Sequence, residues 1–227
     1  MIDDSKSQDG LLERLLARPL VYRAWQAPFV RKKIRPLRRR LDPTQSGRVL
    51  DIGCGPGTNA FLFPGETYVG VDLNPSYIRY AQQKFPGRFE VWDVTKPGPN
   101  LGKFDTVLIN SVFHHLSDVE TAHVLGSLGS HVYDDARIFV IDLVLPSSRG
   151  IPRLLASLDR GHYPRRLDHW LRLFGDHLTI THCEPFSVSL MGVSLWELLL
   201  VEARPRASLP RGDMGDSAPE DLDRDYS

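Results

Sequence analysis

Short apolar segments alternate with helical and turn-rich segments through the middle of the chain. The apolar segments predict strands at 48–52, 67–72, 88–92, 104–110 and 137–145. Between them, apolar residues at helical spacing predict helices at 75–84 and 117–130, and a short helix after the first strand that Pro64 and Gly65 end. The last strand, RIFVIDLVL, is almost continuously apolar, which is typical of a central parallel strand covered on both faces. Strands that alternate with helices predict a doubly wound α/β sheet.

The end of the pattern is different. Two further strand-like segments, 177–188 and 193–202, are joined only by residues 189–192. A connection this short cannot carry a parallel crossover, so the two segments form an antiparallel hairpin. The sequence therefore predicts a mostly parallel, seven-stranded sheet that ends in an antiparallel C-terminal hairpin.

The pattern divides the chain into three parts. Residues 1–46 form an N-terminal helical segment, in which Pro28 and Pro36 separate short helices. Residues 47–203 form the α/β domain, and the Pro-, Gly- and acid-rich residues 204–227 form a disordered tail. The N-terminal segment has three interpretations: a helical layer packed on the domain, a lid over its ligand site, or a surface at residues 11–40 that meets anionic lipid.

The formal net charge is zero, but the charges are unevenly placed. Residues 31–40 hold seven basic side chains, whereas residues 212–227 hold six acidic ones and one Arg. The two cysteines, Cys54 and Cys183, have neither metal nor redox spacing, which favours a reducing compartment. No signal peptide or membrane-spanning apolar run is visible, so we expect a cytoplasmic location.

The stretch VLDIGCGPGTN, from Val49 to Asn59, carries the clearest chemistry. A short strand ends in a turn with three glycines, and such a turn lets a ligand approach the backbone closely. Thr58 occupies the position of the last glycine in the G-x-G-x-x-G pattern. Because pyrophosphate binding uses that last glycine, the departure favours a ligand without phosphates.

This stretch resembles the first motif of the class I S-adenosylmethionine (SAM)-dependent methyltransferases. Three further segments follow in the family's order: YVGVDLNPSYIRYA, FEVWDVT and FDTVLINSVFHHL. Each contains a strand that ends in a polar residue, namely Asp72, Asp93 and Asn110. Together the four segments cover residues 49–116, and the resemblance implies a SAM cofactor.

The resemblance assigns roles to the strand ends. Asp72 binds the two ribose hydroxyls of SAM, Asp93 receives the exocyclic amine of its adenine, and the glycine turn lies against its methionine portion. Cys54 is interpreted as a small space-filling residue of that turn. The expected cofactor-binding residues are Asp51, Gly53, Cys54, Gly55, Gly57, Asn59, Asp72, Leu73, Asp93, Val94, Asn110 and Ser111.

His115 and His114 directly follow the fourth strand, where a methyl acceptor would approach. Histidine has a suitable pKa for removing a proton from an acceptor, so both are candidate general bases, with His115 preferred. The alternative for each is a packing or helix-capping role. We expect no metal site, because adjacent histidines point in different directions and no carboxylate partner is evident.

The crossover at 147–176 supplies candidate acceptor contacts. Arg160, Tyr163 and Arg165 predict a pocket for a small acceptor with a carboxylate or phosphate, and the alternative is a solvated amphipathic helix. The sequence after the fourth strand lacks the Asn/Asp-Pro-Pro-aromatic pattern of enzymes that methylate nucleic-acid bases or glutamine. We therefore expect a small-molecule or lipid-like acceptor and no nucleic acid, and the sequence has no signature of an oligomeric state.

Two other functions compete with methyl transfer. One is a dinucleotide-binding oxidoreductase of the NAD type, which Thr58 and the C-terminal hairpin disfavour. The other is a non-catalytic protein that binds SAM or a membrane surface through residues 11–40. Binding of SAM against NAD separates the first, and liposome flotation with and without 11–40 addresses the second.

Overall fold

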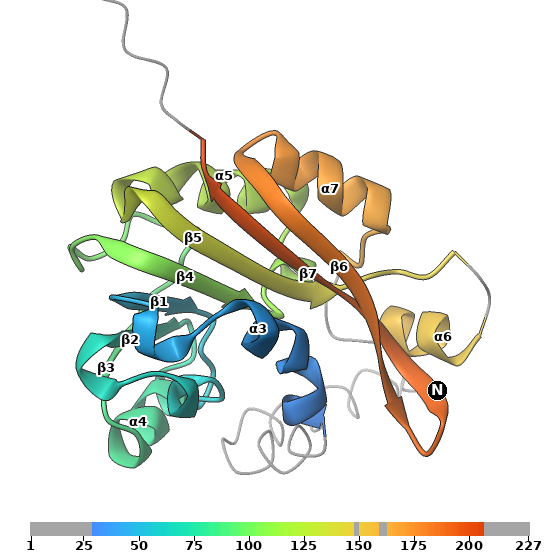
Figure 1. Cartoon of the computed structure of the whole chain (residues 1–227), viewed down its shortest axis with the longest axis horizontal. Helices are drawn as coiled ribbons and strands as arrows, with labels where there is room; N and C mark the ends of the chain where they lie inside the picture. The colour runs from blue at the N-terminus through green and yellow to red at the C-terminus, as the bar shows by residue number, and fades with distance from the viewer. Residues whose placement is uncertain (1–28, 148–149, 159–162, 207–227) are drawn as a thin grey trace, which may run out of the picture.

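The computed structural model describes residues 29–147, 150–158 and 163–206. Residues 1–28 of the N-terminal segment, Arg160 and nearly all of the acidic tail lie outside these residues. Within them, one seven-stranded sheet organises the chain, with strand order β3-β2-β1-β4-β5-β7-β6 (Figure 1). The strands are β1 Val49–Ile52, β2 Tyr68–Asp72, β3 Arg88–Val91, β4 Phe104–Asn110, β5 Val132–Leu143, β6 Leu178–Leu190 and β7 Val193–Pro205.

The first five strands pair in parallel, whereas β7 runs antiparallel to both β5 and β6. The predicted fold, including the C-terminal hairpin, is thus confirmed. The hairpin turns at Met191 and Gly192, whose φ angles of 49° and 80° are both positive. Two consecutive positive φ angles are typical of the tight turns that join antiparallel strands.

Helices cover both faces of the sheet. They are α3 Arg35–Arg40, α4 Pro75–Lys84, α5 Asp118–Ser127, α6 Ile151–Leu158 and α7 Leu167–Gly175. One apolar core includes Val124 of α5 and Trp170 of α7. Figure 1 shows the helices α5 and α7 on the same side of the sheet. The second core includes Leu37 of α3 and Ile78 of α4. The parallel strands are therefore buried between two layers, as their continuous apolar character predicts.

Local sequence signals account for the helix starts. Asn74 accepts hydrogen bonds from the backbone N–H groups of Ser76 and Tyr77, with Pro75 in the first helical position. Ser117 and Glu120 form a reciprocal capping box at the start of α5. These two N-termini lie where the sequence predicts them.

Three boundaries differ from expectation. No α-helix follows the glycine turn, because the chain forms only a 3-10 turn at Ala60–Leu62 before Pro64. The helix expected at 117–130 ends its α-helical part at Ser127 and continues as a 3-10 turn. β5 spans Val132–Leu143 rather than 137–145, since an irregular register lets Val132 pair with Phe104 and Val144 instead bridges to Arg165.

Candidate functional site

The glycine turn between β1 and Ala60 requires glycine at specific positions. Gly53, Gly55 and Gly57 have φ angles of 70°, 56° and 78°, which L side chains rarely adopt. A Cβ on Gly53 would lie 2.3 Å from Val112 Cγ2, and one on Gly57 would lie 2.6 Å from the Phe85 ring. The turn is therefore packed closely against the segment after β4 and against the end of α4.

Cys54 packs inside this turn. It is 1% exposed and belongs to the apolar core beneath α3 and α4. Burial raises the pKa of its thiol well above the ordinary value, so the reactive thiolate is disfavoured. These contacts agree with the space-filling role expected from the sequence.

Asp51 is the buried support of the turn. Its carboxylate accepts a 2.5 Å hydrogen bond from the Tyr68 hydroxyl and a 3.1 Å bond from Asn59 Nδ2. Burial raises the pKa of Asp51 to about 7, although both hydrogen bonds oppose that shift. Asn59 in turn accepts a 3.2 Å bond from Asn110 Nδ2. Asp51 therefore acts within the protein, by linking the ends of β1 and β4 through Asn59.

Asp72, at the end of β2, reaches back to the glycine turn. One carboxylate oxygen accepts the Gly55 N–H at 2.9 Å, and the other accepts the Asn74 N–H at 2.8 Å. Burial raises the pKa of Asp72, which these two bonds oppose. Leu73 beside it is 67% exposed. The carboxylate is thus fixed in orientation and keeps further acceptor lone pairs for a ligand.

Asp93 follows β3 and closes its own turn. Its carboxylate accepts bonds from the Thr95 hydroxyl at 2.6 Å and from the Thr95 N–H at 3.2 Å, and it pairs with Lys96 at 2.7 Å. The bond from Lys96 contributes most to lowering the pKa of Asp93. Val94 packs against the core. Asp93 and Val94 thus directly follow β3, which pairs in parallel with β2.

A cavity opens above the glycine turn. It is lined by Gly53–Gly55, Thr58, Asn59 and Asn110 on one side and by Val30, Lys33 and Ile34 on the other. Two buried polar atoms of this lining, Thr58 Oγ1 and Asn110 Oδ1, have no hydrogen-bond partner in the described structure. Since buried polar groups are normally paired, these atoms fit a ligand with both a donor and an acceptor. The methionyl end of SAM, which has an ammonium and a carboxylate group, meets that requirement.

Beyond β4, Ser111 has a φ of 59° and the chain forms a 3-10 turn at Phe113–His115. His114 is 4% exposed, and its Nδ1 lies 2.6 Å from Oδ1 of Asp142. His115 is exposed, and its ring centroid lies 4.1 Å from that of His114. The expectations that these rings point in different directions and lack a carboxylate partner are therefore wrong.

Asp142 is the carboxylate that sequence reasoning missed. It is 0% exposed near the end of β5, and it also accepts the N–H groups of Phe113 at 2.8 Å and Leu143 at 2.7 Å. Burial acts to raise its pKa, but His114 and the hydrogen bond from the Leu143 N–H lower it overall. The available signal was a single acid inside the apolar run FVIDLVL. Among the described residues, no group of three or more His, Cys, Asp or Glu side chains could hold a metal ion.

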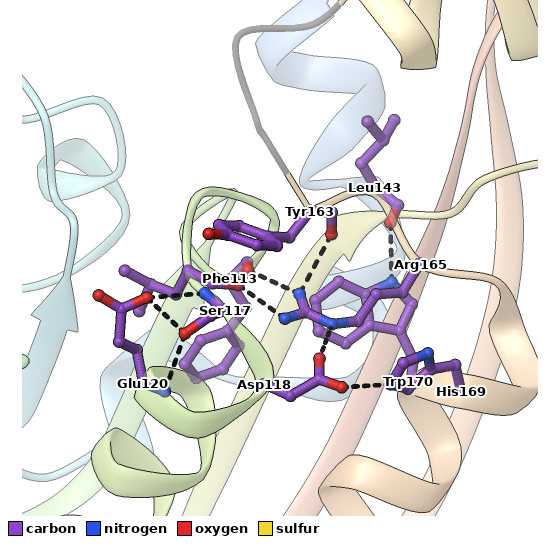
Figure 2. A network of polar contacts seen from close by, with 10 residues as sticks. Phe113, Ser117, Asp118, Glu120, Leu143, Tyr163, Arg165, His169 and Trp170 are labelled. Carbon is purple, nitrogen blue, oxygen red and sulfur yellow. Dashed lines mark hydrogen bonds and ion pairs between the residues drawn. The ribbon is translucent and has the colours of Figure 1, made fainter.

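Arg165 fixes the segment that carries the histidines (Figure 2). Its guanidinium group donates to the carbonyl groups of Phe113 at 2.9 Å, Leu116 at 2.6 Å and Tyr163 at 3.1 Å, and to Asp118 at 2.6 Å. It is 4% exposed, with its central carbon 4.5 Å from the Trp170 ring centroid. The expectation that Arg165 binds an acceptor is corrected, because its hydrogen bonds are directed into the protein.

The other two expected acceptor residues stand apart. Arg160 lies outside the described residues. Tyr163 is 44% exposed, and its N–H donates to the carbonyl of His114 at 3.0 Å. The crossover is thus tied by its backbone to the histidine segment, and the Tyr163 ring reaches solvent at the same edge.

These features define a class of protein: a doubly wound sheet with a glycine turn after β1, acids after β2 and β3, and an antiparallel C-terminal hairpin. That combination is the class I SAM-dependent methyltransferase fold. A family model described as a methyltransferase domain matches residues 22–196. The chain belongs to this family of SAM-dependent enzymes, and S-adenosylmethionine is its cofactor.

Individual comparisons agree with the family. YrrT of Bacillus subtilis, an uncharacterized methyltransferase, is 29% identical over 133 residues, which cover 51% of this chain and 62% of that protein. Trans-aconitate 2-methyltransferase of Variovorax paradoxus is 29% identical over 107 residues, covering 45% of this chain and 41% of that protein. The chain thus spans less than two thirds of the length of these relatives.

A solved structure shows the same fold. Geranyl diphosphate C-methyltransferase of Streptomyces coelicolor, in complex with S-adenosyl-L-homocysteine, has a TM-score of 0.57 and 15% sequence identity. The match covers 81% of this chain and 80% of that chain. None of the helices that the structure describes here is both long and apolar enough to cross a membrane.

Proposed function

We propose that this protein transfers the methyl group of SAM to a small-molecule acceptor that must lose a proton, such as a hydroxyl group. The observation that carries this proposal is the buried pair of His114 and Asp142, with 2.6 Å between Nδ1 and Oδ1. The pair lies after β4 and near the end of β5, at the edge of the sheet that carries the glycine turn. The name of the trans-aconitate relative, which refers to a small acceptor, supports the acceptor class.

The protein's own residues account for most of the chemistry. Bound SAM supplies an electrophilic methyl group on a sulfonium that becomes neutral on transfer. The chain's main task is to hold the acceptor in line with that methyl group, which is worth several kcal/mol of barrier, roughly 7–11 at best. Cofactor positioning falls to the glycine turn, to Asp72 and to Asp93, as the sequence assigns them.

His114 then acts as the general base. Asp142 is ionised, so its hydrogen bond at Nδ1 orients the His114 ring, and Nε2 is the ring nitrogen that we assign to take up the proton of the acceptor. Arg165 and Asp142 hold the backbone on either side of His114, which fixes the ring for this task. His115, which the sequence preferred as the base, is exposed, and its ring lies beside the His114 ring.

Turnover of the His114→Ala and Asp142→Asn variants tests this proposal. A screen of small hydroxyl and carboxyl acceptors with labelled SAM first identifies an acceptor. We expect His114→Ala to lower kcat by roughly 10²- to 10⁴-fold while the affinity for SAM stays unchanged. The matched control is His115→Ala, for which we expect nearly full kcat. Full kcat in His114→Ala would rule out the base and leave positioning as the main contribution.

A further inference from the structure

Lys33 places a cation at the glycine turn. Residues 29–33 are helical and precede α3, and Lys33 lines the same cavity as Gly53, Gly55 and Asn110. Its Nζ donates a hydrogen bond to Ser111 Oγ, at the end of β4. Ile34 is 2% exposed, and its N–H donates to the carbonyl of Val30 at 3.0 Å. Lys33 therefore belongs to a helical segment that is packed against the protein, and this packing holds its side chain at the cavity.

The charge of Lys33 stands out among the groups around it. The other described residues of the cavity lining are uncharged: Val30, Ile34, Gly53, Cys54, Gly55, Thr58, Asn59 and Asn110. Burial is the largest influence on the pKa of Asp142 and raises it, whereas His114 lowers it. The charge of Lys33 lowers the pKa of Asp142 further. The positive charge of Lys33 therefore acts on Asp142 as well as on the cavity.

The chemistry of the cofactor indicates what this cation meets. The sulfonium and the ammonium group of SAM are both positive, so the methionyl carboxylate is the group at this end that attracts a lysine. Asn110 Oδ1, an acceptor without a partner in the described structure, suits the ammonium group. Hydrogen bonds to charged groups are the strong ones, about 1.5–3 kcal/mol each.

We propose that Lys33 binds the α-carboxylate of the methionyl group of SAM, so that residues 29–34 close over that end of the cofactor. This inference rests on the binding of SAM at the glycine turn, and it extends that site to a segment outside the α/β domain. Two adjacent lysines of the basic segment 31–40 then have different partners. Lys33 faces the cofactor, whereas the Nζ of the adjacent Lys32 donates to the carbonyl of Ser189 on the hairpin.

Calorimetric titration of two ligands into three proteins tests the proposal. The ligands are SAM and decarboxylated SAM, which lacks only the carboxylate. The proteins are wild type, Lys33→Met and the matched control Lys32→Met. We expect Lys33→Met to weaken SAM binding by roughly 10- to 100-fold and to leave decarboxylated SAM unchanged. Lys32→Met should bind both ligands as the wild type does.

Each contrary outcome has a distinct meaning. Equal losses for both ligands in Lys33→Met would show that Lys33 only shapes the cavity, which overturns the proposal. Unchanged SAM affinity with a raised KM for a carboxylate acceptor would assign Lys33 to the acceptor instead, and this also overturns it. If wild type itself does not bind SAM, the proposed function fails and not merely the role of Lys33.

A second arm does not depend on the folding of Lys33→Met. Wild type should prefer SAM over decarboxylated SAM by roughly the same 10- to 100-fold, and Lys33→Arg, which keeps the cation, should retain most of that preference. A wild-type protein without this preference would contradict the proposal.

Discussion

At the scale of single residues, Asp51 shows how burial changes a carboxyl group. The side chain has no exposed surface, and its pKa is raised to about 7 by burial. In the unfolded chain the same group titrates near 3.8. The folded state therefore keeps a proton that the unfolded state has lost between about pH 4 and pH 7. It follows that this group's contribution to stability is present below pH 4 and is lost as the pH rises towards 7.

Asp51→Asn replaces this buried carboxyl group with an amide. Since the amide does not titrate, the variant should gain stability relative to wild type as the pH rises from 5 to 8, by a few kcal/mol at about 1.4 per pKa unit. Urea unfolding at several pH values measures this difference. The exposed Asp134 on β5 provides a control, and Asp134→Asn should follow the wild-type profile. Parallel profiles for Asp51→Asn and wild type would contradict the raised pKa.

Substitution of single glycines tests how closely the glycine turn is packed. Gly53→Ala places a Cβ 2.3 Å from Val112 Cγ2 at a φ of 70°, so we expect a loss of at least about 1 kcal/mol of stability and weaker SAM binding. Gly126 in α5 is the matched control, because a Cβ there meets nothing within 4 Å. Gly126→Ala should stabilise the protein by about 0.5–1 kcal/mol. Thermal melts and SAM titrations of both variants measure these changes. Equal changes in stability and SAM affinity for Gly53→Ala and Gly126→Ala would contradict the close packing of the turn.

At the scale of elements, Arg165 joins the crossover to the segment after β4. Its loss would remove one donor from the carbonyl group of Phe113, the guanidinium donor from the carbonyl group of Leu116, and a 2.6 Å ion pair from Asp118. Arg165 also connects the start of α7 to the end of β5, since Leu145 N–H donates to its carbonyl at 2.8 Å. This one side chain therefore determines how several elements meet at the candidate site.

Arg165→Ala should lower the free energy of unfolding by roughly 3 kcal/mol, because buried acceptors lose a charged donor. Arg165→Lys should recover only part of this loss, since a single ammonium group cannot replace the planar donors that reach separate carbonyls. The neighbouring Arg166 has a side chain that is 58% exposed and pairs with Asp168 at 3.6 Å. Arg166→Ala should therefore change stability by less than about 0.5 kcal/mol. Equal effects in chemical unfolding would refute the structural role of Arg165.

The elements that sequence predicts well are those with local signals. β4 and α4 match the expected ranges 104–110 and 75–84, because an apolar run and an Asn-Pro start define them without help from distant residues. The hairpin follows from its short connection. The early start of β5 was not predictable, since its pairing with β4 rather than local preference decides it. The segment after the glycine turn forms only a 3-10 turn at Ala60–Leu62, where the sequence predicted a short helix.

The candidate site divides in the same way. Its glycine turn and strand-end acids lie in short contiguous motifs, so their positions follow from sequence. The pairing of His114 with Asp142 spans 28 positions, and the bond between Arg165 and Phe113 spans 52. Such contacts depend on which strand ends become neighbours and on the path of the crossover, and no local pattern contains that information. Arg165 was accordingly assigned to a ligand although it binds the protein.

At the scale of the whole molecule, three distant parts of the chain converge on one edge of the sheet. The glycine turn and the residues after β2 and β3 form the expected cofactor side. The segment after β4, held by Arg165, carries His114, and residues 30–34 complete the cavity from the N-terminal side. The ion pairs of Arg39 with Glu184 and of Arg40 with Glu202 fix that N-terminal segment on the hairpin. The arrangement joins a cofactor site to a candidate base at the same edge.

The proposed function depends on SAM binding at this edge, with Asp72 on the ribose. Calorimetric titration of SAM and of NAD into wild type and Asp72→Ala measures this binding. We expect wild type to bind SAM and not NAD, and Asp72→Ala to lose about 1.5–3 kcal/mol of SAM binding energy while its fold survives. Tighter binding of NAD than of SAM by wild type would contradict a SAM site at this edge, and unchanged SAM affinity in Asp72→Ala would contradict the ribose role of Asp72.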